Sequence, residues 1–431
     1  MRYKKAAGIC LSLLLTGLLM CGRTETTVYF ADKAKAEETQ SKLPVRWYAG
    51  DYGKKPAVRS QGEYGTCWAL TAAAALETAL LPEEDVLFSA DHMALNNAFE
   101  VPLDDGGDYY MTMAYLSSWQ GPVTEIEDPY GDEYSPPRLS PAVHVQEMQI
   151  LQNPDTEEIK EAVRVYGAVQ ASLYMDRSTA SEESTYYKEE TFGYYYPDEQ
   201  TASHDILILG WDDTFSRDYF SQIPPGDGAF ICQNSWGTEF GEDGIFYVSY
   251  WDANIRKKAL VYSKVEAADN YSDIYQTDAC GWQGVQGYAQ ETCWFANVYT
   301  AESDEELAAA GFYATGPDTE YELYLVHDFE NPESFASRKF LRAGSIERAG
   351  YYTVDLQMPE KLSEGERFAV VVKITTPGTN NPVAVEYRAN EYTQTVVTEG
   401  KEGYLSQRGT KWQHTEESFE TNVCLKVYVN R

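Results

Sequence analysis

The most informative segment of the chain reads Gln61-Gly62-Glu63-Tyr64-Gly65-Thr66-Cys67-Trp68, and an Ala- and Leu-rich run follows at residues 69–77. A glycine-containing turn that leads into such a run predicts a loop followed by a helix, with Thr66 at the N-cap and Cys67 in the first turn. The unpaired amides and the positive end of the helix dipole should favour a thiolate there. Cys67 is therefore a candidate nucleophile.

Gln61 lies six residues before Cys67. Its side-chain amide can converge with the backbone amide of Cys67, and two such donors beside a thiolate form an oxyanion hole. A lone Cys-Trp pair describes a buried apolar contact equally well, because free cysteine is among the most buried residue types. The catalytic interpretation therefore depends on partners elsewhere in the chain.

Two such partners lie downstream. His204 lies two residues before an apolar run at residues 206–209, and Asn234 directly follows another at residues 229–233. A catalytic thiol needs a base, and the base needs a polar group that holds its ring. Taken separately, His204 also fits a structural histidine and Asn234 a turn residue.

In combination these motifs resemble the papain-like cysteine proteases. The resemblance rests on Gln61 and Cys67-Trp68, on His204 at 137 residues after Cys67, on Asn234-Ser235-Trp236-Gly237 and on Asp105-Gly106-Gly107-Asp108. The histidine spacing falls within the roughly 130–150 residues typical of the family. The match covers residues 43–263. It departs from the family where Tyr64-Gly65-Thr66-Cys67 lacks the usual cysteine before the nucleophile, and where residues 215–226 form an insertion before Asn234.

The resemblance implies a role for each of these residues. Cys67 would be the nucleophile, His204 the base and acid, Asn234 the group that orients His204, and Gln61 an oxyanion donor. Gly106 and Gly107 would line the substrate cleft, and Trp236 would shield the bond between His204 and Asn234 from water. The resemblance implies neither a metal nor a cofactor.

The remaining pattern of the first half predicts an α+β papain-like domain with two lobes. Helices are expected at residues 67–81, 88–95, 109–119 and 156–166, and strands at 143–150, 168–174, 206–209, 229–233 and 244–250. A helical lobe followed by a β-rich lobe places Cys67 on one side of a cleft, with His204 and Asn234 on the other. We interpret His92 as a surface or capping residue, and His144 as a rival base that fits the family order poorly.

From about residue 265 the chain changes to short strand-like runs separated by turns, which predicts an all-β sandwich. Residues 296–301, 310–313 and 403–406 resemble the lectin-like domain that follows papain-like domains in exported bacterial proteins. The predicted division is a signal peptide and leader at residues 1–36, a peptidase domain at 37–265 and a lectin-like domain at 266–431.

The composition bears on partners and compartment. The formal net charge of −34 argues against nucleic acid and anionic membranes as partners. A basic start and an apolar run at residues 6–20 predict a signal peptide for export. Alternatively, Cys21 is a lipoprotein attachment site. No later segment is long and apolar enough for a membrane span. We expect a secreted or cell-surface protein.

Of the cysteines beyond the leader, Cys280 and Cys293 are the candidate disulfide pair because they are close in sequence, and Cys232 fits the core. The leading functional hypothesis is a secreted cysteine endopeptidase acting on protein or peptide substrates, with a carbohydrate or cell-surface ligand for the β domain. One alternative is an adhesin or glycan-binding protein with an idle protease-like scaffold. Another is a peptidoglycan amidase, which would not predict Asn-Ser-Trp-Gly.

Overall fold

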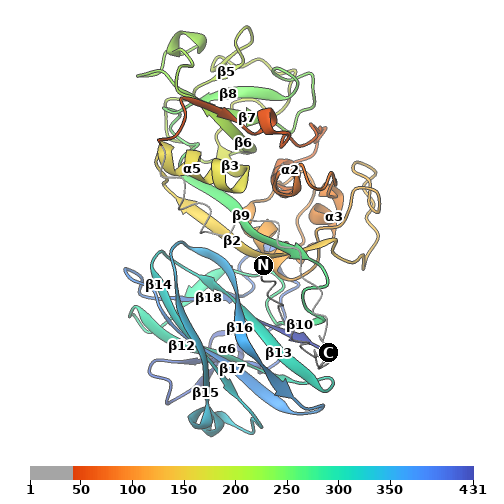
Figure 1. Ribbon diagram of the computed structural model, residues 1–431, viewed down its shortest axis with the longest axis vertical. Coiled ribbons are helices and arrows are strands. Elements are labelled where there is room, and N and C mark those ends of the chain that lie inside the picture. The colour runs from red at the N-terminus through yellow and green to blue at the C-terminus, as the bar shows by residue number, and fades with distance from the viewer. Residues whose placement is uncertain (1–41) are drawn as a thin grey trace, which may run out of the picture.

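The computed structural model describes residues 42–431, so the predicted signal peptide and Cys21 lie outside the described residues. Figure 1 shows two bodies stacked along the long axis, with helices and strands in the upper one and strands in the lower one. Among the described residues, no helix has the length and apolar character needed to cross a membrane.

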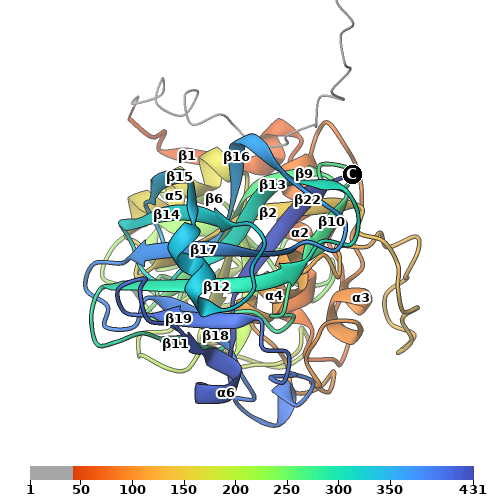
Figure 2. The same cartoon turned by 90° about the horizontal axis from the view of Figure 1, so that it is seen from below.

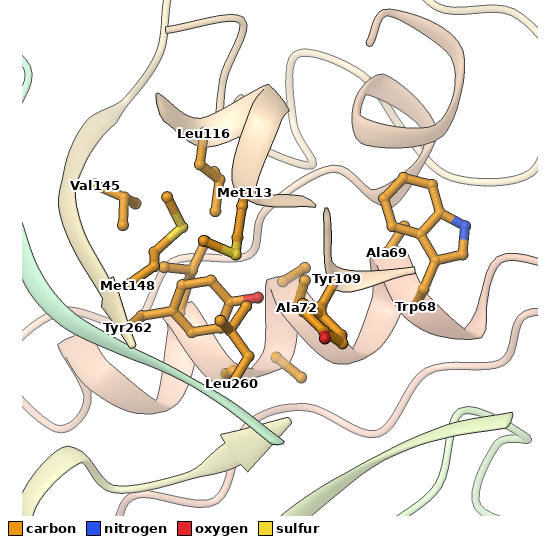
Figure 3. Packing of buried hydrophobic residues seen from close by; sticks show 14 of the residues in the cluster. Trp68, Ala69, Ala72, Tyr109, Met113, Leu116, Val145, Met148, Leu260 and Tyr262 are labelled. Atoms are coloured by element: carbon orange, nitrogen blue, oxygen red, sulfur yellow. The ribbon is translucent and has the colours of Figure 1, made fainter. Parts of the chain in front are cut away.

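The helical side of the upper body is built on one central helix. Its helices are α2 (Cys67–Leu80), α3 (Ala90–Leu95) and α4 (Tyr109–Ser117). Every residue of α2 after Cys67 is buried, including Glu77, whose carboxylate pairs with Arg59 over 2.7 Å. In Figure 3, Trp68, Ala69 and Ala72 of α2 lie in one cluster with side chains of α4 and of two neighbouring strands. The cluster anchors the residue that follows Cys67.

The β-rich side of the upper body carries the other predicted site residues. Its strands are β1 (Arg46–Tyr48), β2 (Val143–Gln152), β3 (Val169–Leu173), β4 (Tyr187–Lys188), β5 (Gly193–Tyr194), β6 (His204–Asp212), β7 (Ala229–Gln233), β8 (Ile245–Ser249) and β9 (Lys258–Ala267). The helix α5 (Thr156–Tyr166) packs on this sheet and begins with a capping box between Asp155 and Glu158. The expected helix at residues 156–166 is confirmed.

The lower body is a β-sandwich, as the sequence predicts (Figure 2). Its elements are β10 (Asp273–Tyr275), β11 (Gly284–Gln286), β12 (Thr292–Thr300), β13 (Glu305–Ala314), β14 (Thr319–Val326), β15 (Lys339–Ile346), β16 (Gly350–Leu362), β17 (Arg367–Thr375), β18 (Val383–Glu386), β19 (Gly403–Ser406), β20 (Gln413–His414), α6 (Thr415–Phe419), β21 (Asn422–Val423) and β22 (Leu425–Asn430). Short 3-10 turns lie in the lower body at η3 (Pro332–Ser337) and η4 (Glu391–Thr393), and in the upper body at η1 (Ala49–Tyr52) and η2 (Arg217–Tyr219). Apolar side chains of both sheets fill the space between them.

One sheet runs through both bodies. Strand β16 of the sandwich pairs antiparallel with β2 of the upper body, with Gly350 opposite Gln149 and Tyr352 opposite Glu147. This pairing joins the strands into a sheet of 13 strands. The two bodies therefore share backbone hydrogen bonds as well as side-chain contacts.

Three local expectations are wrong. His92 is buried, and its Nδ1 hydrogen-bonds the Tyr115 hydroxyl over 2.7 Å, because α3 packs inward. Helix α4 ends at Ser117, two residues before the expected end. Cys280 and Cys293 are both free, since Cys280 lies against the carbonyl of Ala98 and Cys293 against that of Ser406.

Candidate active site

Cys67 is the first residue of α2, and its thiol is free. Thr66 occupies the N-cap position, but its hydroxyl hydrogen-bonds the phenol of Tyr130 instead of capping the helix. The backbone amide of Asp205 donates a hydrogen bond to the Cys67 thiol. One turn further along α2, the Thr71 hydroxyl donates to the carbonyl of Asp205 over 3.2 Å. These bonds hold the start of α2 against the start of β6, where His204 lies.

His204 and Asn234 form a hydrogen-bonded pair at the ends of neighbouring strands. The distance from His204 Nε2 to Asn234 Oδ1 is 2.7 Å. The backbone amide of Ser235 also donates to Oδ1 over 2.8 Å, so this atom is an acceptor and Nε2 must carry the hydrogen. The pair thereby selects the tautomer in which Nδ1 has a free lone pair.

Trp236 covers this pair. Its ring centroid lies 4.8 Å from that of His204, with the planes tilted by 37°. Trp236, His204 and Asn234 are all buried. Exclusion of water strengthens the hydrogen bond between His204 and Asn234.

Burial controls the electrostatics of the thiol and the imidazole. It raises the pKa of Cys67 to about 12, and the nearby Asp205 carboxyl raises that pKa as well. Burial lowers the pKa of His204 to about 4, although the hydrogen bond to Asn234 acts in the opposite direction. This differs from the expectation that the helix terminus favours a thiolate, because burial and Asp205 outweigh the helix dipole. Burial thus disfavours both the thiolate form of Cys67 and the imidazolium form of His204.

Gln61 is fixed beside the residue that follows Asn234. Its backbone amide donates to the Ser235 carbonyl over 2.8 Å, and its Oε1 accepts from the Ser235 hydroxyl over 2.7 Å. Its Nε2 donates to the carbonyl of Tyr64 over 2.7 Å. Since an amide nitrogen has two hydrogens, one remains for a further acceptor. The structure thus brings Gln61 next to Asn234 through Ser235.

Gly106 and Gly107 pack directly against the segment that carries Cys67. A Cβ on Gly107 would lie 2.5 Å from the Trp68 ring, and a Cβ on Gly65 would lie 2.8 Å from the Gly106 nitrogen. Gly106 has a φ of +84°, which favours glycine. Both glycines line a cavity of about 500 Å³. The two glycines therefore border both the segment that carries Cys67 and an open recess.

Asp205 and its surroundings were missed by the sequence analysis. The carboxyl group of Asp205 is buried and accepts hydrogen bonds from Ser172 Oγ over 2.6 Å and from Gln170 Nε2 over 2.8 Å. Burial raises its pKa to about 6. The available signal was a carboxylate placed directly before the apolar run at residues 206–209. Such a residue needs hydrogen-bond partners if it is buried.

The rival base His144 lies elsewhere. Its ring stacks on Trp119 with centroids 3.7 Å apart, and its Nδ1 contacts Asn270 Oδ1 over 2.6 Å. Both contacts belong to the junction between the two bodies. His144 is therefore a buried structural residue.

Comparison with known proteins agrees with this geometry. Residues 44–264 match the papain family cysteine protease, and residues 274–429 match the lectin like domain. The chain belongs to the papain family of cysteine proteases. Its architecture is a papain-like domain followed by a lectin-like β domain, as the sequence predicts.

Relatives by sequence include cathepsin L of Sarcophaga peregrina, 28% identical over 207 residues, and cathepsin K of Mus musculus, 29% identical over 205 residues. Each alignment covers 45% of this chain, with 55% of the first relative and 57% of the second. The chain thus spans about half the length of these relatives, and the shared part is the peptidase domain.

Solved structures extend the likeness to both bodies. The clostridial cysteine protease Cwp84 after propeptide cleavage is 23% identical with a TM-score of 0.78, over 89% of this chain and 99% of that one. A second structure holds the cysteine protease and lectin-like domains of Cwp84, a surface layer associated protein of Clostridium difficile. It is 22% identical with a TM-score of 0.75, and the match covers 90% of this chain and 89% of that one. At this identity the likeness concerns the fold, including the arrangement of the two domains.

Proposed function

We propose that the chain is a cysteine endopeptidase in which Cys67, His204 and Asn234 catalyse hydrolysis of peptide bonds. The observation that carries the proposal is the hydrogen bond of 2.7 Å between His204 Nε2 and Asn234 Oδ1. His204 begins β6, and the backbone amide of the next residue, Asp205, donates to the Cys67 thiol. This bond leaves His204 Nδ1 as the atom that exchanges protons. A buried histidine and asparagine in this arrangement match the needs of a thiol nucleophile.

The chemistry follows from these positions. His204 Nδ1 takes the thiol proton as Cys67 Sγ attacks the peptide carbonyl carbon. The carbonyl oxygen becomes an oxyanion that accepts hydrogen bonds from the Cys67 backbone amide and from Gln61 Nε2. The imidazolium then protonates the leaving amine, and an acyl-enzyme remains. Water, deprotonated by His204, releases the acid and restores the thiol.

The division of labour along the chain is part of the proposal. Residues 37–265 form the peptidase domain, with Gly106, Gly107 and Trp236 at the substrate cleft, and residues 266–431 form a lectin-like domain that binds a carbohydrate or cell-surface ligand. Residues 1–36 direct export, and the alternative to release is a lipid anchor at Cys21. The surface association stated for Cwp84 supports this location.

A thiol-reactive peptidyl epoxide tests the mechanism. Wild-type protein should be labelled and should cleave members of a quenched fluorescent peptide library, and Cys67→Ala should do neither. Cys232→Ala is the matched control because Cys232 is buried in β7, so this variant should keep labelling. Folded wild-type protein that is neither labelled nor active would overturn the proposal. Release of fragments from peptidoglycan instead of peptides would favour an amidase.

A further inference from the structure

A cavity of about 500 Å³ lies where the β domain meets the peptidase domain. Residues of both domains line it. The peptidase side contributes Phe99, Val101, Asp105, Gly106, Gly107, Asp108, Tyr110 and Met111, and the β-domain side contributes Trp282, Gln283, Asn390, Tyr392 and Thr393. The papain-like half alone therefore supplies only one wall of this recess.

The cavity adjoins the segment that carries Cys67. Gly106 and Gly107 belong to its lining, and these glycines pack on Gly65 and Trp68, on either side of Cys67 in sequence. A peptide that leads into Cys67 along the two glycines enters this recess. The position of the cavity thus matches the part of a substrate on one side of the scissile bond.

The β-domain wall is held in place by specific contacts. The Tyr392 hydroxyl donates to Asp105 Oδ2 over 2.9 Å, and the Tyr392 carbonyl accepts from the backbone amide of Glu100 over 2.9 Å. The Trp282 ring meets the Tyr110 ring edge to face, with centroids 5.6 Å apart. These bonds fix two aromatic side chains of the β domain opposite the glycines.

The lining has a defined chemistry. It offers the rings of Phe99, Tyr110, Trp282 and Tyr392, together with two carboxylates, and includes no lysine, arginine or histidine. Asp105 is an exposed residue of this lining, whereas Asp108 Oδ1 accepts hydrogen bonds from the backbone amides of Tyr110 and Met111 at the start of α4. Lys258, which is not part of the lining, has its Nζ 5.8 Å from the Tyr110 ring centroid. A long side chain with an apolar stem and a positive end complements such a lining.

We propose that the β domain completes a substrate subsite, in which Trp282, Tyr392 and Asp105 select a lysine or arginine side chain of the peptide. The inference rests on the proposed peptidase function and assigns to the β domain a direct part in its specificity. The stem of the basic side chain packs on Trp282 and Tyr392, and its positive end lies near Asp105.

The test compares kcat/KM for peptides that differ at a single position. Full-length protein is assayed with a fluorogenic library in which each position on the amino-terminal side of the cleaved bond holds Arg, Lys, Met or Glu. Wild type should prefer Arg and Lys over Met at one of these positions. Asp105→Asn and Trp282→Ala should each reduce that preference by about fivefold, and high salt should reduce it in wild type.

Controls separate selectivity from folding. Asp105→Asn keeps an oxygen that can accept from Tyr392, so its fold should be intact even if Trp282→Ala loosens the domain contact. Phe340→Ala removes an exposed aromatic side chain from β15, outside the cavity, and should keep the wild-type preference. Thermal unfolding and the rate of Cys67 alkylation verify that each variant is folded.

The possible outcomes are distinct. Wild-type protein that cleaves peptides without preferring a basic residue at any tested position overturns the subsite while leaving the peptidase function intact. An unchanged preference in folded Asp105→Asn and Trp282→Ala does the same. Wild-type protein that cleaves no peptide at all contradicts the peptidase function and, with it, this inference.

Discussion

The backbone amide of Asp205 hydrogen-bonds the thiol of Cys67, so a buried aspartate lies beside the proposed nucleophile. Its carboxyl group is held by Ser172 and Gln170. Neither of these two partners carries a positive charge, and the negative charge of Asp205 raises the pKa of the thiol. This arrangement makes the reactivity of Cys67 depend on the charge state of Asp205.

Removal of that charge should make Cys67 more reactive. In Asp205→Asn the side chain keeps its shape, while the negative charge that raises the thiol pKa is absent. We expect iodoacetamide to alkylate Cys67 several-fold faster at pH 7.5 than in wild type. Below pH 5 Asp205 is protonated in wild type, since its pKa is about 6, and the difference between the two proteins should vanish. An equal ratio of rates at both pH values would contradict this prediction.

The same substitution should change how stability depends on pH. Burial raises the Asp205 pKa from 3.8 to about 6, so the folded protein binds this proton more tightly than the unfolded chain. The contribution of Asp205 to the free energy of unfolding is therefore most favourable below pH 4. As the pH rises through 6, the protein loses about 3 kcal/mol of this stability. Urea unfolding should find Asp205→Asn more stable relative to wild type at pH 8 than at pH 4. Glu239→Gln serves as the control, because it removes the charge of an exposed carboxylate.

Loss of the orienting group should impair turnover more than binding. Asn234→Ala removes the acceptor that fixes the His204 tautomer through a bond of 2.7 Å. Because Asn234 raises the pKa of His204, its loss also makes the imidazolium less accessible. We expect kcat to fall at least tenfold with KM nearly unchanged, measured on a peptide that wild type cleaves. A proportional rise in KM with constant kcat would assign Asn234 to substrate binding instead.

Local signals in the sequence were sufficient for much of the site. The Ala-rich run after Cys67 predicts α2 because alanine has the highest intrinsic helix propensity, and Asp155 with Glu158 predicts the start of α5 through their own capping bonds. The order of Cys67, His204 and Asn234 indicates the family. The structure then adds the bond between His204 and Asn234.

Features that depend on distant partners could not be predicted. Thr66 lies at the expected N-cap, but its hydroxyl hydrogen-bonds Tyr130. The buried carboxylate of Asp205 accepts hydrogen bonds from Ser172 and Gln170 of the neighbouring strand. His92 is polar and short-range rules place it at the surface, whereas Tyr115 supplies a buried partner. The pairing of β16 with β2 joins residues about 200 positions apart, which periodicity does not encode.

The junction between the domains should depend on Gly350. This residue has a φ of +148°, and a Cβ placed on it would lie 2.0 Å from the backbone carbonyl oxygen of Met148. In Gly350→Ala the start of β16 must therefore move away from β2. We expect a loss of at least about 2 kcal/mol in the free energy of unfolding and two separated transitions in calorimetry, because the domains would no longer unfold together.

Gly365→Ala is the matched control for this prediction. Gly365 also has a positive φ, +80°, but a Cβ there would meet nothing within 4 Å. Alanine is strained in both variants because both positions have a positive φ, but only Gly350→Ala adds a clash with the Met148 carbonyl oxygen. Gly350→Ala should consequently be the less stable variant and the one whose transitions separate. Equal losses in the two variants, with a single transition in each, would show that the shared sheet does not couple the domains.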